Sequence, residues 1–135
     1  RLIDALKQVQ GAYSLVALHN GAMIGARDPL GVRPLVLGRL VGGPALHQVL
    51  GGAPGEAEGG PGWVLASETC ALDIVGAEFV RDVDPGEIVI VDDAGVRSIK
   101  PFGRQQSRFC VFEYIYFARP DSVVEGTPVY DTRKR

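Results

Sequence analysis

The chain has 135 residues and a mass of 14.4 kDa, close to one ordinary domain and too short for two. Hydrophobic residues make up 46% and charged residues 22%, which excludes a disordered tail because there is enough apolar surface to bury. The net charge of −2 indicates no nucleic-acid partner, and no apolar run approaches the roughly 20 residues that span a membrane. Two cysteines are too few for a disulfide scaffold and favour a cytoplasmic location.

Both ends of the chain have the pattern of interrupted helices. Apolar residues at helical spacing occupy positions 2–9, and Gly11 ends that helix. Near the other end, Thr127 is the expected N-cap and Pro128 the expected first residue of a helix. We therefore expect the sequence to be an internal fragment of a longer protein.

Three strands are predicted in the first third of the chain. Residues 12–18 and 22–28 are apolar runs joined by Asn20-Gly21, the dipeptide most typical of a tight hairpin. A third strand is expected at 34–37. Residues 42–62 contain eight glycines and three prolines, so we expect a flexible surface loop there.

The second half predicts a strand, a helix and more strands. Residues 63–68 form a strand that leads into a short helix with Ser67 as its N-cap. Three strands follow, joined by Asp-Pro-Gly and Asp-Ala-Gly turns. The aromatic run 109–117 alternates like a long, packed strand. This order predicts a layered fold with a largely antiparallel sheet rather than a βαβ repeat.

No catalytic constellation can be assembled from these residues alone. His19 and His47 lie in turn or loop contexts, and no G-x-S-x-G motif is present. The histidines and cysteines match no zinc spacing, and no phosphate-binding glycine motif follows a strand. The pair Asp92-Asp93 fits a solvated hairpin tip. We therefore predict no catalytic residue within the chain.

Four segments are nonetheless distinctive: RDPLGVRPLVLG (27–38), ASETCALD (66–73), VRDVDPGEIV (80–89) and FEYIYFARPDS (112–122). Together they resemble the bacterial amidophosphoribosyltransferase family over almost the whole chain. The first two motifs also occur in other glutamine amidotransferases that use an N-terminal nucleophile. FEYIYFARPDS is narrower and resembles amidophosphoribosyltransferases in particular.

The resemblance implies an α+β fold. Residues 1–105 would form the C-terminal part of a type-2 glutamine amidotransferase domain, a partial four-layer αββα sandwich of the N-terminal-nucleophile (Ntn) hydrolase type. Residues 106–135 would form the crossing into a phosphoribosyltransferase domain and the start of that domain.

The resemblance also implies a parent enzyme that makes 5-phosphoribosylamine from glutamine and phosphoribosyl pyrophosphate, the first step of de novo purine synthesis. Its N-terminal cysteine nucleophile would precede Arg1, and its phosphate-binding loop and Mg²⁺ site would follow Arg135. The parent is expected to be a cytoplasmic homo-oligomer, and the fragment by itself to be inactive.

Several residues have two interpretations under this resemblance. Arg27, Asp28 and Arg33 could support the glutamine pocket from behind, but we favour a structural role in which they lock the hairpin through charge-assisted hydrogen bonds. Ser67 and Glu68 are likewise expected to begin a helix rather than to react.

The C-terminal motif contains the expected interdomain residues. Tyr114, Tyr116 and Arg119 belong to the crossing, where the aromatic rings could line a path for ammonia or simply pack on a core. Cys110 stands where some relatives place one ligand of a 4Fe–4S cluster, whose other three thiolates lie far downstream in those relatives; a small buried apolar role is the alternative. Cys70 is expected in the core.

Two other functions remain open at this point. One is the glutaminase part of another type-2 amidotransferase, such as an asparagine synthetase. The other is a non-catalytic module that keeps the sheet and lacks the nucleophile.

Overall fold

A computed structural model describes residues 1–40, 62–103 and 105–134, so all of the predicted 42–62 loop except Gly62 lies outside the described residues, as does His47. The elements are α1 (Leu2–Leu6), β1 (Ser14–His19), β2 (Ala22–Arg27), β3 (Val36–Leu40), β4 (Gly62–Ala66), α3 (Thr69–Ile74), β5 (Ala77–Asp82), β6 (Ile88–Asp92), β7 (Gly95–Ile99), the π-helix η1 (Glu113–Phe117), β8 (Val123–Val124), β9 (Thr127–Pro128) and α4 (Val129–Arg133). One sheet has the order β1-β2-β6-β7 and a second has the order β4-β3-β5. All pairings within the described residues are antiparallel, as expected.

The predicted first hairpin is confirmed, and its turn sets the register of its strands. Asn20 and Gly21 both have positive φ, 48° and 76°, as the two central residues of a type I′ turn require. Their conformation pairs His19 with Ala22 and, at the far end, Ser14 with Arg27. The turn therefore fixes where Arg27 lies at the opposite end of the sheet.

The two sheets pack face to face, and strand β6 shows why. Its apolar residues are continuous, and successive side chains point to opposite faces of the sheet. Val89 and Val91 face the second sheet, where they join Leu35 and Leu37. The core cluster on the other face of the first sheet consists of Leu6 from α1 with Tyr13, Ala26 and Ile88.

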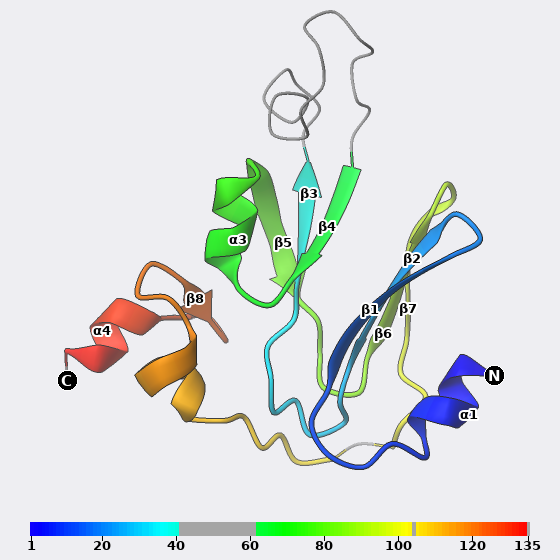
Figure 1. Cartoon of the computed structure of the whole chain (residues 1–135), viewed down its shortest axis with the longest axis horizontal. Coiled ribbons are helices and arrows are strands. Elements are labelled where there is room, and N and C mark those ends of the chain that lie inside the picture. Colours follow the sequence, from blue (N-terminus) through cyan, green and yellow to red (C-terminus); the bar gives the residue numbers. More distant parts are fainter. Residues whose placement is uncertain (41–61, 104, 135) are drawn as a thin grey trace, which may run out of the picture.

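Helix α3 covers the outer face of the second sheet. Leu72 packs there against Val36 and Ala77, with Val64 and Val75 beside them. Figure 1 shows the resulting arrangement, with α3 on one side of the paired sheets and α1 on the other. None of the helices in the described parts of the chain is long and apolar enough to cross a membrane.

The C-terminal segment, residues 105–134, runs beneath both sheets from the side of α1 to the side of α3 (Figure 1). Its backbone is tied to the loop after β2, because Arg108 N–H donates to the carbonyl of Leu30 at 2.7 Å and Cys110 N–H to that of Val32 at 3.2 Å. The segment also has its own small core of Ala118, Val124 and Val129, flanked by Phe109 and Tyr114.

The prediction of a long aromatic strand over 109–117 is wrong. Residues 113–117 form a π-helix, closed by a 2.9 Å hydrogen bond from Ala118 N–H to the carbonyl of Glu113. Arg133 of α4 caps this turn from outside, donating to the carbonyls of Tyr114 and Ala118 at 2.6 and 2.7 Å. The alternation of aromatic residues misled the prediction, since Tyr116 is 78% exposed rather than packed on a core.

Two predicted helix caps are also displaced. Helix α3 begins after Glu68 rather than after Ser67, and neither residue caps it with a side-chain hydrogen bond. At the C-terminal end, Thr127 pairs with Val124 in a two-residue ladder, and α4 begins one residue after Pro128. Thr127 lies in the short strand β9, whereas Ser67 lies in the bend between β4 and α3.

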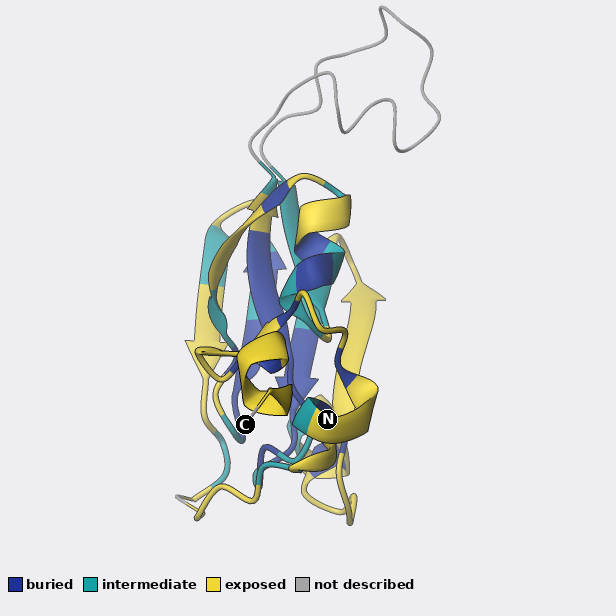
Figure 2. Ribbon diagram, turned by 90° about the vertical axis from the view of Figure 1, so that its left-hand side faces the viewer, coloured by how far each residue is buried: buried dark blue, intermediate teal, exposed yellow. Residues whose placement is uncertain are grey.

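Strand β1 is the exposed edge of the first sheet. All six of its residues are exposed, and Leu18 is 83% exposed. Figure 2 shows the buried residues along the middle of the molecule and the exposed residues on outer strands and helices. An unpaired edge with apolar side chains is prone to pair with another chain.

Gly38 gives a test of the contact between β3 and α3. A Cβ at this position would lie 2.7 Å from Leu72 Cδ2 and 3.2 Å from the Glu78 carbonyl oxygen. We expect Gly38→Ala to lower the free energy of unfolding by about 1–3 kcal/mol through overpacking. Chemical denaturation should show no comparable loss for Gly103→Ala, whose Cβ would meet nothing within 4 Å. Equal midpoints for the two variants would contradict the packing.

Candidate functional site

A buried arginine organises the end of the sheets that faces the C-terminal segment. Arg27 ends β2 and is 1% exposed, so its charge must be both hydrogen-bonded and paired. Its guanidinium donates to the carbonyls of Arg33 (2.8 Å), Val83 (2.7 Å) and Gly31 (3.1 Å), and to the Glu125 carboxylate (2.6 Å). One side chain thus joins two loops of the sheets to a residue 98 positions along the chain.

Asp28 shapes the loop that follows. It is fully buried, and its two carboxylate oxygens accept hydrogen bonds from the backbone N–H groups of Leu30 and Val32 at 3.0 and 3.1 Å. Its carbonyl accepts two more, from Gly31 and Gly86. These bonds close the loop on itself in the manner of an Asx turn. The predicted structural roles of Arg27 and Asp28 fit this geometry.

Arg33 leaves the same loop toward the π-helix. Its NH1 lies 3.0 Å from Glu113 Oε1, and its guanidinium carbon lies 4.3 Å from the centre of the Phe117 ring. Glu113 is buried, and its Oε1 is in ion-pair contact but outside hydrogen-bond geometry. Burial raises the pKa of the Glu113 carboxyl, while the Arg33 charge acts in the opposite direction.

Glu68 makes a third tie to the C-terminal segment. Its Oε2 accepts from the backbone N–H of Arg119 at 2.9 Å and from the hydroxyl of Ser122 at 2.8 Å. The neighbouring Thr69 hydroxyl accepts from Val123 N–H at 2.9 Å. Ser67, predicted together with Glu68, is exposed. We call the set Arg27, Arg33, Glu68, Glu113 and Glu125 the junction.

The remaining predicted residues of the crossing lie around the junction. Tyr114 donates its hydroxyl to the Val124 carbonyl at 2.8 Å, which anchors the β8–β9 ladder. Tyr116 points outward, and the Arg119 side chain pairs with Asp121 on the surface. Cys110 is half-buried just before the π-helix. Seven of the predicted residues therefore lie at or next to this set of contacts, whereas Tyr116 and Ser67 face solvent. The seven are Arg27, Asp28, Arg33, Glu68, Cys110, Tyr114 and Arg119.

Glu87 is a buried charge that the sequence analysis did not single out. It is 1% exposed and accepts from both terminal nitrogens of Arg81 (2.9 and 2.7 Å), from the Ser98 hydroxyl (2.5 Å) and from Asp84 N–H (2.7 Å). Burial alone would raise the pKa of Glu87, but the hydrogen bonds from Arg81 and Ser98 hold it below its usual value. Its own carbonyl accepts from Arg27 N–H, so the two networks adjoin.

Three carboxylates that pair with arginines were thus missed by sequence reasoning: Glu87, Glu113 and Glu125. The first two had a usable signal, because each is a single charge inside or beside a run of apolar residues. A buried carboxylate in such a run needs a cationic partner. Glu125 lies in a polar turn and gave no such signal.

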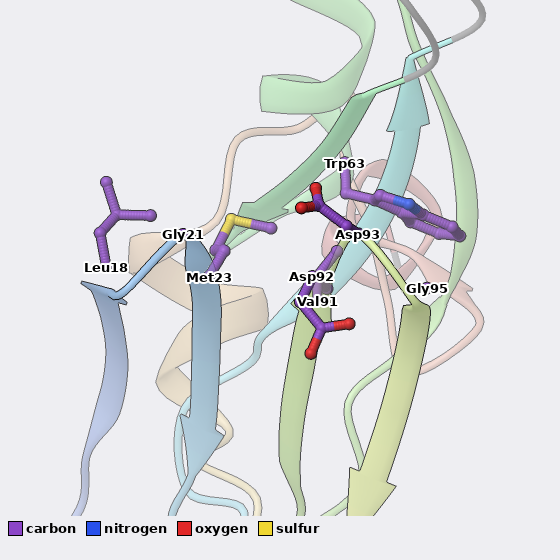
Figure 3. A pocket seen from close by; sticks show the side chains of 8 residues that line it. All are labelled: Leu18, Gly21, Met23, Trp63, Val91, Asp92, Asp93 and Gly95. Atoms are coloured by element: carbon purple, nitrogen blue, oxygen red, sulfur yellow. The ribbon is translucent and has the colours of Figure 1, made fainter.

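The described residues also line one surface pocket of about 490 Å³ at the opposite end of the sheets (Figure 3). It lies at the tips of the β1–β2 and β6–β7 hairpins, with Trp63 of β4 beside them. Its lining residues are Leu18, Gly21, Met23, Trp63, Val91, Asp92, Asp93 and Gly95. Asp92 pairs with Arg97 and accepts from Ala94 N–H, as expected of a solvated hairpin tip.

The junction holds segments together and carries no reactive pair. His19, the one histidine among the described residues, ends β1 at the far end of the first sheet. In the described parts of the chain, no three His, Cys, Asp or Glu side chains are grouped to hold a metal ion. A 4Fe–4S cluster needs four thiolates, and the chain has two cysteines, one of them buried in α3. Cys110 would therefore supply one ligand of such a cluster, with further thiolates coming from outside this sequence, and its metal role stays a prediction.

Loss of the Glu125 carboxylate tests the Arg27 pair. We expect Glu125→Gln to destabilise the structure by about 1–3 kcal/mol, because a buried guanidinium loses its charged partner. Amide hydrogen exchange should speed up in the β8–β9 ladder. The matched control is Asp121→Asn, which removes an exposed pair and should change exchange little. Equal effects of the two substitutions would contradict a special role for Arg27.

Glu87 gives a pH-dependent prediction. Because folding lowers the pKa of Glu87, its carboxylate stabilises the fold above the unfolded value of about 4.5, and this contribution disappears as pH falls through the folded pKa. Glu87→Gln should therefore be less stable than the wild type at pH 7, with a difference that narrows below about pH 4.5. Urea denaturation over a pH series measures it, with exposed Glu78→Gln as control. A pH-independent difference would refute the prediction.

Comparison with known proteins gives concordant results from sequence and structure. No family model matches the chain. Amidophosphoribosyltransferases from Rhizobium etli and Synechococcus elongatus are 45% and 46% identical over 99% and 98% of this chain, and one from Mycobacterium tuberculosis is 45% identical over 97%. The chain spans only 21–24% of the length of these relatives.

Two solved structures are similar over 98% of the chain. One is the glutamine phosphoribosylpyrophosphate amidotransferase from B. subtilis in complex with ADP and GMP, with a TM-score of 0.78 and 38% identity. The other is described as the allosteric regulatory enzyme of purine biosynthesis, with a TM-score of 0.81 and 37% identity. The chain covers 25% and 24% of these structures. The chain is therefore homologous to a segment, about a quarter in length, of the amidophosphoribosyltransferases.

Proposed function

We propose that this chain acts as a segment of an amidophosphoribosyltransferase that joins its two reaction centres. The observation that carries the proposal is a match to enzymes of that name at 45–46% identity. The match extends over at least 97% of the chain and therefore includes the motif at 112–122. This extent favours an amidophosphoribosyltransferase over the glutaminase part of an asparagine synthetase. It also favours an enzyme segment over a non-catalytic module.

The layering supports the finer fold proposal. Helix α1, the two antiparallel sheets and α3 follow one another as in a four-layer αββα sandwich, here in part. We assign this part, residues 1–105, to a glutaminase domain of the Ntn-hydrolase type. Residues 106–135 are assigned to the crossing and to the start of a phosphoribosyltransferase domain, since they add a separate small core below the sheets.

The proposed reaction has two halves. Water hydrolyses the side-chain amide of glutamine, giving glutamate and ammonia. The ammonia nitrogen then bonds to the anomeric carbon of phosphoribosyl pyrophosphate as the bond to pyrophosphate breaks and a proton leaves. The nucleophile for the first half and the Mg²⁺ and phosphate site for the second are assigned to parts of the enzyme outside this sequence, in a cytoplasmic homo-oligomer.

The contribution of this chain is to fix the geometry between the two halves. Arg27 and Asp28 hold the loop after β2, and Glu68 ties α3 to the crossing. Pre-positioned groups accelerate a reaction because the cost of ordering them is met during folding. If the enzyme holds a 4Fe–4S cluster, Cys110 would supply one of its four thiolates and the other three would come from outside this sequence.

The full-length protein that contains these residues provides the test. With glutamine and phosphoribosyl pyrophosphate together, we expect glutamate and pyrophosphate to be released in equal amounts, measured by coupled assays. The 135-residue chain alone should release neither. A full-length protein that releases no pyrophosphate with either glutamine or ammonia would refute the proposed function.

A further inference from the structure

We propose that Arg33 is a positioning residue that couples the two half-reactions by fixing the π-helix η1. The proposal rests on the proposed function, because coupling has meaning only in a two-centre enzyme. Arg33 belongs to the loop after β2, and its two partners, Glu113 and Phe117, belong to the crossing segment. It is thus a direct side-chain link from the sheets to η1.

The geometry of η1 allows one arginine to contact both of its ends. Glu113 and Phe117 are the first and last residues of the π-helix, four positions apart, and so lie on one face of it. The Arg33 guanidinium contacts both, with its NH1 3.0 Å from the carboxylate and its central carbon 4.3 Å from the centre of the aromatic ring. A planar cation can satisfy these two contacts together, whereas an ammonium group cannot do so equally well.

Glu113 makes the link obligatory. Its side chain is 5% exposed, Arg33 is its ion-pair partner, and the nearby Glu68 carboxylate adds repulsion. A buried carboxylate without its cation is strongly unfavourable. When Arg33 is removed, either η1 must move so that Glu113 reaches water, or the Glu113 carboxylate must take up a proton. The Arg27 charge is also close to Glu113, but Arg27 is already committed to three carbonyls and Glu125.

The opposite face of η1 is what this link holds in place. It carries one aliphatic and one aromatic side chain, since Ile115 and Tyr116 are 59% and 78% exposed. Ammonia released into water is protonated near neutral pH and loses its nucleophilic lone pair, so its transfer requires a surface that excludes water. A π-helix displaced from its position would open that surface and let ammonia escape.

The experiment compares three rates in the full-length enzyme: glutamate release, phosphoribosylamine synthesis from added ammonia, and synthesis from glutamine. For Arg33→Met we expect the first two to stay near wild type and the third to fall about tenfold. Arg33→Lys should give an intermediate loss, and Glu113→Gln should also lower the yield of phosphoribosylamine per glutamate. Arg39→Met is the matched control, since Arg39 of β3 lies against Trp63 of β4, away from the crossing.

The outcomes separate the possible failures. An unchanged yield per glutamate in both Arg33→Met and Glu113→Gln would overturn the inference, as would a proportional loss of all three rates together with a lower melting temperature. If Arg33→Met fails to fold, Arg33→Lys and Glu113→Gln decide the question by the same ratio. A wild-type enzyme that makes no phosphoribosylamine from either glutamine or ammonia refutes the proposed function itself, whatever the variants do.

Discussion

The structure depends on a single buried cation. The Arg27 guanidinium lies where β2 ends, and its donors reach three loop carbonyls and one carboxylate. Leaving such a group unpaired inside a protein costs more free energy than most single contacts supply. The loops on both sheets must therefore converge on it, and the C-terminal segment must supply Glu125. The position of the crossing relative to the sheets follows from this electrostatic requirement.

The sheets provide the rigid support that such a network needs. Strands β2 and β6 bury residues on both faces, toward α1 on one side and toward the second sheet on the other. Strands anchored on two faces have little freedom to slide, because a shift by one residue would exchange the faces of every side chain. The residues at their ends, Arg27 and Glu87 among them, are thereby held in fixed register.

The parts of the fold that are determined by adjacent residues were predicted from the sequence. The parts that are determined by contacts between residues distant in sequence were not. The Asn20-Gly21 turn and the turns around Gly86 and Gly95 depend on a few adjacent residues, so their strands were located correctly. The aromatic run was assigned to a strand because alternation was its only local pattern. What decides its conformation is Arg33 from the sheets and Arg133 from α4, which are far away in sequence. The cationic half of the junction was predicted from motifs, but its acidic partners Glu113 and Glu125 were not.

The β8–β9 ladder is closed by Glu125, whose φ of 47° lies in the left-handed region. This conformation favours glycine, asparagine and aspartate and disfavours a longer side chain by about 1–2 kcal/mol. The same residue must also reach the Arg27 guanidinium with a carboxylate. Glycine would relieve the backbone and lose the charge, and aspartate would keep the charge on a side chain shorter by one methylene. At position 125 the backbone favours a short residue, whereas the ion pair with Arg27 needs a long acidic side chain. Glutamate satisfies the ion pair and accepts the cost of the left-handed backbone conformation.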